Sequence, residues 1–334
     1  MKKDNPAKEF EKCLDISDRF DLIFTERVSL PIARLFAKLD ASPNLVSVLG
    51  GLFGIGGAVL FVFQNLICTI IGILMVIFCA ILDCADGQVA RISHKGSLYG
   101  RCLDGTIDSI VYFAIYLCLS IRIIFHDNIP FTDIAWYSWW GLGLFAFIVL
   151  FGVFIHAPQS RMADYYRNAH MYLSASERGN ELSNSIDMKA IVDATPKHTL
   201  KHFVLNSYTT YTKAQEKATP KLQKLLALIR ENGGVIPTEV STYYRSESNK
   251  IARLANALVF NVRTYTLFAL LLATEILTVT GVCTFDWAIL IFPLVLLTLE
   301  PIKWFLIIKY ERIAVKATAV MQKVLDEGKE KKSI

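Results

Sequence analysis

The sequence predicts an all-α, polytopic membrane protein with six transmembrane helices, an N-terminal interfacial helix and a helical cytoplasmic insert. Hydrophobic residues make up 53% of the 334 residues and charged residues only 19%, below the share of about 25% in soluble domains. No Asp, Glu, Lys or Arg occurs between Asp40 and Asp83, and a bilayer-spanning helix needs about 20 apolar residues. A single soluble domain is therefore excluded as a first interpretation. A net charge of only +5 does not indicate a nucleic-acid-binding protein either.

The first element expected along the chain is an interfacial helix. Residues 10–37 alternate charged residues with Ile, Leu and Phe, which is typical of a helix lying on a membrane surface. We assign residues 1–42 to this cytoplasmic segment.

Six apolar segments long enough to span a bilayer follow. The first two form a hairpin that turns at Gln64 and Asn65, and a long polar interval separates the fourth from the fifth. The expected spans are residues 44–63, 66–85, 98–125, 134–156, 264–283 and 287–308. This divides the chain into 43–157 with four spans, 158–260 as the insert, and 261–334 with two spans and a tail.

The distribution of Lys and Arg predicts the orientation. The loops after the first, third and fifth spans contain neither residue, whereas the N-terminus, residues 91–101, the insert and the tail are rich in them. Because cytoplasmic loops carry the positive excess, both termini are expected in the cytoplasm. Arg122 is the exception, near the outer end of the third span, and we expect its side chain to snorkel to the interface.

The insert is expected to form amphipathic helices with a positive excess. Thr219 is suited to cap a helix that begins at Pro220 and ends near Asn232. Its apolar face would consist of Leu222, Leu225, Leu226 and Ile229. The positive excess fits a solvated face attracted to anionic lipid, with specific ligand binding as the alternative.

Two pairs of acids lie where the second span ends and the third begins. Asp83 and Asp86 are spaced i, i+3, while Asp104 and Asp108 are spaced i, i+4, so each pair shares a helix face. Consecutive antiparallel spans bring both pairs together at the cytoplasmic side. Four carboxylates at the edge of hydrocarbon need cations, and two divalent ions, Mg²⁺ or alternatively Mn²⁺, suit oxygen ligands.

A two-metal carboxylate site is typical of in-line displacement at phosphorus. Gly87, Ala90 and Gly100 have little or no side chain and share the faces of the acids, which leaves room for a nucleotide to approach the backbone. A calcium loop is the rival interpretation, but the twelfth position from Asp83 is His94 rather than Glu.

The full pattern, D-x2-D-G-x2-A-R-x8-G-x3-D-x3-D from Asp83 to Asp108, resembles the signature of the CDP-alcohol phosphotransferase family (class I). The resemblance implies a membrane enzyme that transfers a substituted phosphoryl group from a CDP-linked donor to a hydroxyl and releases CMP. It implies that Asp83, Asp86 and Asp104 hold the metals. It also implies that Asp108, counted with these metal-binding acids, is the general base.

The same resemblance implies a nucleotide surface. Gly87, Ala90 and Gly100 would contact cytidine and ribose, and Arg91 the diphosphate. The segment from Pro43 to Ser47 is similar to the family's P-N-x-x-T entry to the first span, with Ser for Thr, so Asn44 is a further candidate. The expected partners are the donor, the alcohol acceptor, membrane lipid and a second copy of the chain in a homodimer, with no nucleic acid.

The donor and acceptor stay open at this point. The six-span layout is similar to the CDP-diacylglycerol branch with a small polar alcohol as acceptor. The alternative is a CDP-choline or CDP-ethanolamine phosphotransferase with a diacylglycerol or ceramide-like acceptor. A divalent-cation transporter is a remote alternative from another class, and a catalytically silent scaffold is a third.

For several other polar residues the sequence leaves two possible roles open. Lys95 and Arg101 are expected to be membrane anchors or ligands of an acceptor phosphate. His156, followed by Gln159, Arg161 and Asp164, is either an interfacial histidine or part of the acceptor site. Glu275 and Glu300 are intramembrane acids and hence functional candidates, although Glu300 precedes Lys303 and could pair with it.

Overall fold

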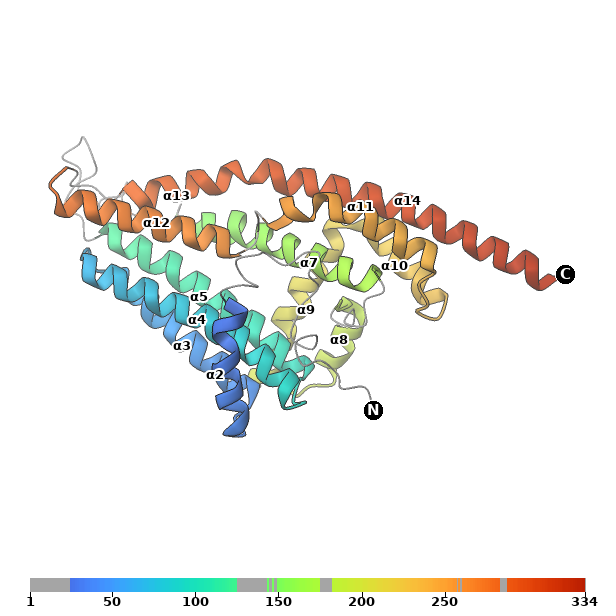
Figure 1. Ribbon diagram of the computed structural model, residues 1–334, viewed down its shortest axis with the longest axis horizontal. Coiled ribbons are helices and arrows are strands. Elements are labelled where there is room, and N and C mark those ends of the chain that lie inside the picture. The colour runs from blue at the N-terminus through green and yellow to red at the C-terminus, as the bar shows by residue number, and fades with distance from the viewer. Residues whose placement is uncertain are drawn as a thin grey trace.

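The computed structural model describes residues 25–124, 143, 146, 149–174, 182–256, 258, 260–282 and 287–333. Every regular secondary-structure element in these ranges is a helix (Figure 1), which confirms the predicted all-α class. The helices are α2 (Glu26–Lys38), α3 (Pro43–Leu60), α4 (Leu66–Ile92), α5 (Leu98–Ile124), a π-helical turn η2 (Gly152–His156), α7 (Ala157–Leu173), α8 (Ser185–Asp193), α9 (Leu200–Ala218), α10 (Pro220–Glu231), α11 (Thr238–Asn256), α12 (Phe260–Val279), α13 (Trp287–Thr298) and α14 (Glu300–Ser333).

Four stretches of the described chain are long and apolar enough to cross a membrane: Pro43–Leu60, Leu66–Ile92, Leu98–Arg122 and Ile291–Glu327. They support the prediction of an integral membrane protein. The expected span at 134–156 falls mostly outside the described residues. The expected span at 264–283 lies largely in α12, which is helical but is not among these four stretches. The number six is therefore still a prediction.

The hairpin of α3 and α4 is closed by capping and by direct backbone contact. The Ser42 hydroxyl accepts a hydrogen bond from the Leu45 amide at 3.2 Å, and the Asn65 side chain caps α4. A Cβ added to Gly57 would lie 2.6 Å from the carbonyl oxygen of Gly72. The two backbones thus touch, as small residues permit between membrane helices.

Helix α2 lies across the hairpin at the end where α4 stops (Figure 1). Its Ala33 is fully buried in a small core with Val46 of α3 and Leu82, Ala85 and Val89 of α4. The Ser29 hydroxyl donates to the Cys84 sulfur at 3.2 Å. The expected interfacial segment is therefore helical from Glu26 onward, and its earlier residues lie outside the described chain.

A second core joins the insert to the last helix. It is built from α7, α10, α11 and α14 and contains the predicted apolar face of α10, Leu222, Leu225, Leu226 and Ile229. Thr219 occupies the N-cap position, but its hydroxyl donates to the Gln215 carbonyl at 2.9 Å instead of capping α10. The carboxylate of Glu311 in α14 accepts from the amides of Lys221 and Leu222 at 2.9 and 3.1 Å.

The prediction that Arg122 snorkels to the interface is wrong. Its side chain is 2% exposed and forms an ion pair with Glu275 of α12, whose side chain is 4% exposed. The guanidinium also donates to the carbonyls of Phe61 and Phe63, and Thr69 donates to Glu275 at 2.9 Å. Both charges are satisfied within the protein, so Glu275 ties α12 to α4 and α5.

Replacing Glu275 by alanine should destabilise the protein strongly, because it leaves the Arg122 charge buried without its counter-ion. Losing one partner of a buried pair costs about 3–5 kcal/mol, and we expect a lower midpoint of thermal unfolding in detergent. The control is Glu247→Ala, which removes an exposed pair with Lys250 and should cost less than about 1 kcal/mol. Equal shifts in the two variants would contradict a stabilising role for the buried pair.

Candidate active site

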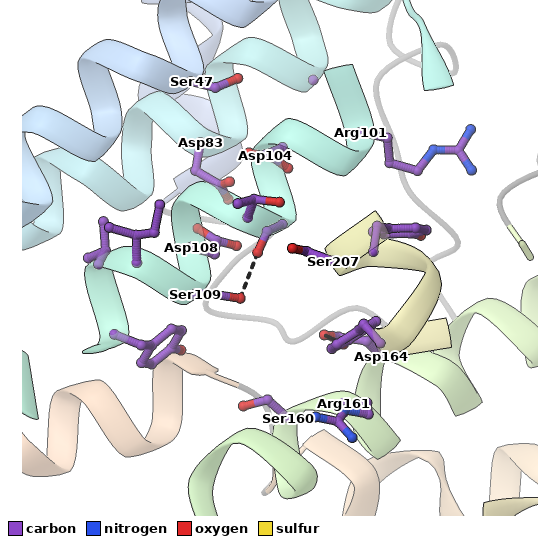
Figure 2. Close-up of a pocket in the computed structure, with 18 of the residues that line it drawn as sticks. Ser47, Asp83, Arg101, Asp104, Asp108, Ser109, Ser160, Arg161, Asp164 and Ser207 are labelled. Atoms are coloured by element: carbon purple, nitrogen blue, oxygen red, sulfur yellow. Dashed lines mark hydrogen bonds between the residues drawn. The ribbon is translucent and has the colours of Figure 1, made fainter. Parts of the chain in front are cut away.

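Three acids predicted from the motif come together between α4 and α5. One carboxylate oxygen from each of Asp83, Asp86 and Asp104 lies within 4.8 Å of the others. Helix α3 packs against both α4 and α5, and this arrangement holds the acid-bearing parts of the two helices at a fixed separation. Asp108 stands one turn further along α5 and lines the same cavity. Figure 2 shows Asp83, Asp104 and Asp108 directed toward a common space.

Ser47 of α3 supports the buried member of this group. Its hydroxyl donates to Asp86 Oδ2, and the exposed fractions of Ser47 and Asp86 are 5% and 6%. Ser47 belongs to the segment that begins the first span, and no role was predicted for it. The available signal was that Ser47 takes the place of the Thr in the P-N-x-x-T segment and so keeps a hydroxyl there. The sequence does not show which residue of another helix this hydroxyl contacts.

The residues expected to bind the nucleotide lie around the same cavity. Gly87, Ala90, Arg91, Gly100 and Asn44 all line it. A Cβ added to Gly100 would stand 2.8 Å from the Asn44 side-chain oxygen, so the start of α5 and the start of α3 meet there because position 100 has no side chain. These residues, separated in sequence, thus lie around one cavity, and their contact with a nucleotide stays a prediction.

The cavity has a volume of about 1250 Å³ and extends well beyond the acids. Ligand pockets commonly have about 300–1,000 Å³, so this cavity is larger than a typical site for one small ligand. The α3, α4 and α5 side carries the acids and the small residues. The opposite wall comes from α7 and α9 of the insert, through Ser160, Arg161, Asp164, Arg167, Asn168, Ser207, Tyr208, Thr210 and Tyr211. The contribution of α9 was not foreseen from the sequence.

Lys95 is held by a neighbouring loop. Its ammonium lies 2.6 Å from Asp40 Oδ1 and donates to the Asp40 carbonyl at 3.4 Å. The hydrogen bond and the charge of Lys95 lower the pKa of the exposed Asp40 carboxyl from its ordinary value. This contact joins the loop that follows α4 to the loop that precedes α3, beside the residues expected to bind the nucleotide. Arg101 also lines the cavity, and its side chain extends away from the acids in Figure 2.

His156 is buried at the cavity rather than exposed at an interface. It is 4% exposed, and its Nδ1 lies 2.8 Å from the Tyr116 hydroxyl. Its ring packs edge-on against that of Tyr112, with 4.6 Å between the ring centres. Within the described part of the chain, its Nε2 has no hydrogen-bond partner. Glu300 pairs with Lys303 at 2.6 Å, as foreseen, and accepts from Gln159 at 2.9 Å.

Comparison with known proteins relates the site to a named family. Residues 41–172 match the family model for CDP-alcohol phosphatidyltransferase. Phosphatidylinositol phosphate synthases of Mycobacterium tuberculosis and Mycobacterium bovis are 34% identical over 101 residues, which cover 30% of this chain and 45% of theirs. An uncharacterized protein of Aquifex aeolicus is 30% identical over 113 residues, 34% of this chain and 48% of its own. The chain thus spans about half the length of these relatives, and no solved structure matches it.

Proposed function

Because residues 41–172 match the CDP-alcohol phosphatidyltransferase family, we propose that this membrane protein is a phospholipid-synthesising transferase. It transfers a substituted phosphoryl group from a CDP-linked donor to an alcohol hydroxyl and releases CMP. The observation that carries the proposal is the close group of Asp83, Asp86 and Asp104 at a cavity large enough for donor and acceptor. The acids lie on two helices, α4 and α5, whereas a path for cation transport needs polar groups along several helices, and this favours a transferase.

The acids fit divalent metal ions. Three carboxylate oxygens within 4.8 Å of one another repel each other unless cations lie among them, and Mg²⁺ or Mn²⁺ prefers such hard ligands. Asp83, Asp86 and Asp104 would hold two ions, with Asp108 beside them. When bound, the ions stabilise negative charge on the attacking and leaving oxygens of a displacement at phosphorus.

The residues around the acids have separate roles in substrate binding and proton transfer. Gly87, Ala90, Gly100 and Asn44 hold the cytidine and ribose, and Arg91 contacts the diphosphate. Asp108 accepts the proton of the acceptor hydroxyl. The oxygen of that hydroxyl bonds to the β-phosphorus of the donor, and the bond between this phosphorus and the CMP oxygen breaks. The protein supplies orientation and charge, which provide most of the catalysis in phosphoryl transfer.

CDP-diacylglycerol is the proposed donor, with a small polar alcohol as acceptor. The mycobacterial relatives are named for a product that contains a phosphatidyl group, and this supports transfer of such a group here. The competing assignment is CDP-choline or CDP-ethanolamine with a lipid hydroxyl.

A CMP-release assay tests the function. Purified protein with Mg²⁺ is given labelled CDP-diacylglycerol or CDP-ethanolamine, each with a panel of polar alcohols and with diacylglycerol. We expect CMP only when CDP-diacylglycerol and a polar alcohol are both present. CMP formed only from CDP-ethanolamine and diacylglycerol would reverse the donor assignment, and no CMP from any pair would contradict the function.

The proposed topology has six spans in the domain arrangement predicted from the sequence, with both termini, the active site and residues 158–260 in the cytoplasm and two copies in a homodimer. Lys224 is exposed on α10. In a variant of the protein without its own reactive cysteines, a single cysteine at position 224 should be inaccessible to an impermeant thiol reagent added to intact cells. A cysteine at Gln64, exposed in the turn between α3 and α4, is the matched control and should be labelled. The reverse pattern would show the opposite orientation.

A further inference from the structure

Helix α9 lies beyond the residues matched by the family model, yet it packs on the helix that carries Asp104 and Asp108. Val204 and Leu205 of α9 share a core with the fully buried Cys102 of α5, together with Met188 and Val192 of α8. Val204 and Leu205 are each 1% exposed. The insert is therefore attached to the first turns of α5 by close packing, and α9 has a defined position relative to the acids.

The second half of α9 is joined to α7 by polar contacts. Gln215 donates to the Arg161 carbonyl at 3.0 Å, and the Tyr211 hydroxyl donates to Asp164 Oδ2 at 3.3 Å. The Arg161 guanidinium lies over the Tyr211 ring, 5.2 Å from its centre. Tyr211 thus orients one negative and one positive side chain of α7 at the same time.

These groups face the acids across the cavity. Ser207, Tyr211, Arg161 and Asp164 line the same cavity as Asp104 and Asp108. Figure 2 shows the Ser207 hydroxyl directed toward the space beside Asp108 and Ser109. Among the described residues, nothing bonds to the Ser207 hydroxyl, and it is free to bond to a ligand.

The two sides of the cavity differ in chemistry. Near the acids, α4 and α5 contribute the apolar side chains Val76, Ile110, Val111 and Phe113, which suit the hydrocarbon part of a lipid substrate. The α7 and α9 wall offers hydroxyls, two guanidinium groups and a carboxylate instead. A polyhydroxylated alcohol matches that wall, because its hydroxyls can donate to Asp164 and accept from Arg161, whereas the single hydroxyl of a diacylglycerol offers the wall far fewer hydrogen bonds.

We propose that α9 of the insert forms the acceptor-selecting wall of the active site and that its ligand is a small polyhydroxylated alcohol. Ser207 contacts the alcohol directly, and Tyr211 is a positioning residue that acts through Asp164 and Arg161. This inference rests on the proposed transferase function. It gives the insert a part in substrate recognition that the motif residues do not supply.

Tyr211→Phe and Ser207→Ala test the inference, and Tyr243→Phe is the matched control. Tyr243 lies on α11 outside the cavity, and its variant loses the same hydroxyl as Tyr211→Phe. Losing one hydrogen bond should raise the acceptor KM by about three- to tenfold in each α9 variant. We expect the donor KM and kcat to stay within about twofold of the parent. Saturating polyol should also raise the unfolding temperature of the parent and of Tyr243→Phe more than that of Tyr211→Phe.

The outcomes separate this inference from the function on which it rests. If the parent releases no CMP from any substrate pair, the transferase proposal fails. If the parent is active but the acceptor KM of both α9 variants stays within about twofold of it, α9 does not select the acceptor. A rise in donor KM equal to that in acceptor KM would likewise overturn the inference, because it would indicate a general structural role.

Discussion

Replacing Asp86 by alanine should abolish CMP release while the protein still inserts into the membrane. Asp86 is the most enclosed acid of the group, 6% exposed and bonded to Ser47, so alanine removes a carboxylate that the fold holds in one position. We expect a loss on the order of 10²–10³-fold or more, the effect of removing a preorganised charge-stabilising group. Radioactive CMP release by purified parent and variant at equal concentration measures it.

Metal titration tests whether the acids act by binding a divalent metal ion. Excess chelator should abolish the activity of the parent, and added Mg²⁺ should restore it. Ser47→Ala leaves the carboxylate in place but removes its orienting hydroxyl, and should raise the Mg²⁺ concentration for half-maximal activity about 10- to 100-fold. Asp193→Ala, an exposed acid of α8, is the control and should behave as the parent. Undiminished release by Asp86→Ala, or full activity in chelator, would refute the metal assignment.

Replacing Asp108 by asparagine should separate donor binding from turnover. The substitution keeps the shape of the side chain and removes its basicity. Asp108 is not among the three acids whose oxygens lie within 4.8 Å of one another, although it lines the same cavity. We therefore expect donor affinity within a few fold of the parent and a turnover loss on the order of 10²-fold or more. Single-turnover rates and equilibrium donor binding measure the two effects.

The alternative outcome for Asp108 is equally informative. If donor affinity falls in proportion to turnover, Asp108 is chiefly a metal ligand. The base would then be another group of the cavity, and His156 is the next candidate because its Nε2 has no hydrogen-bond partner in the described chain. His156→Gln would test that assignment with the same two measurements.

The local parts of the site were predictable from the sequence. Asp83, Asp86 and Asp104 converge because helical spacing sets which acids share a face and a short connection makes consecutive helices antiparallel. The close approach of Gly100 to Asn44 was not predicted, although both residues were assigned to one surface. The start of α5 at Leu98 and the apolar face of α10 also follow from the length and periodicity of the apolar residues, whereas the predicted side-chain cap by Thr219 does not form.

The long-range pairings were not predictable in this way. Arg122 was expected at the interface, because nothing near it in the sequence indicates Glu275, which comes from a helix much later in the chain. The packing of Val204 and Leu205 on Cys102 was missed for the same reason. An amphipathic pattern shows that a helix has a buried face but not which partner covers it.

The capping of α10 by Glu311 has a consequence for the order in which the chain acquires its structure. The ribosome makes α7, α10 and α11 before α14, yet α14 supplies both the carboxylate for the first turn of α10 and the buried residues Tyr310, Ala314, Ala317 and Met321 of their common core. A nascent chain that ends before residue 310 lacks all of these groups. The core of the insert is thus completed only late in translation, when the last apolar stretch has been made.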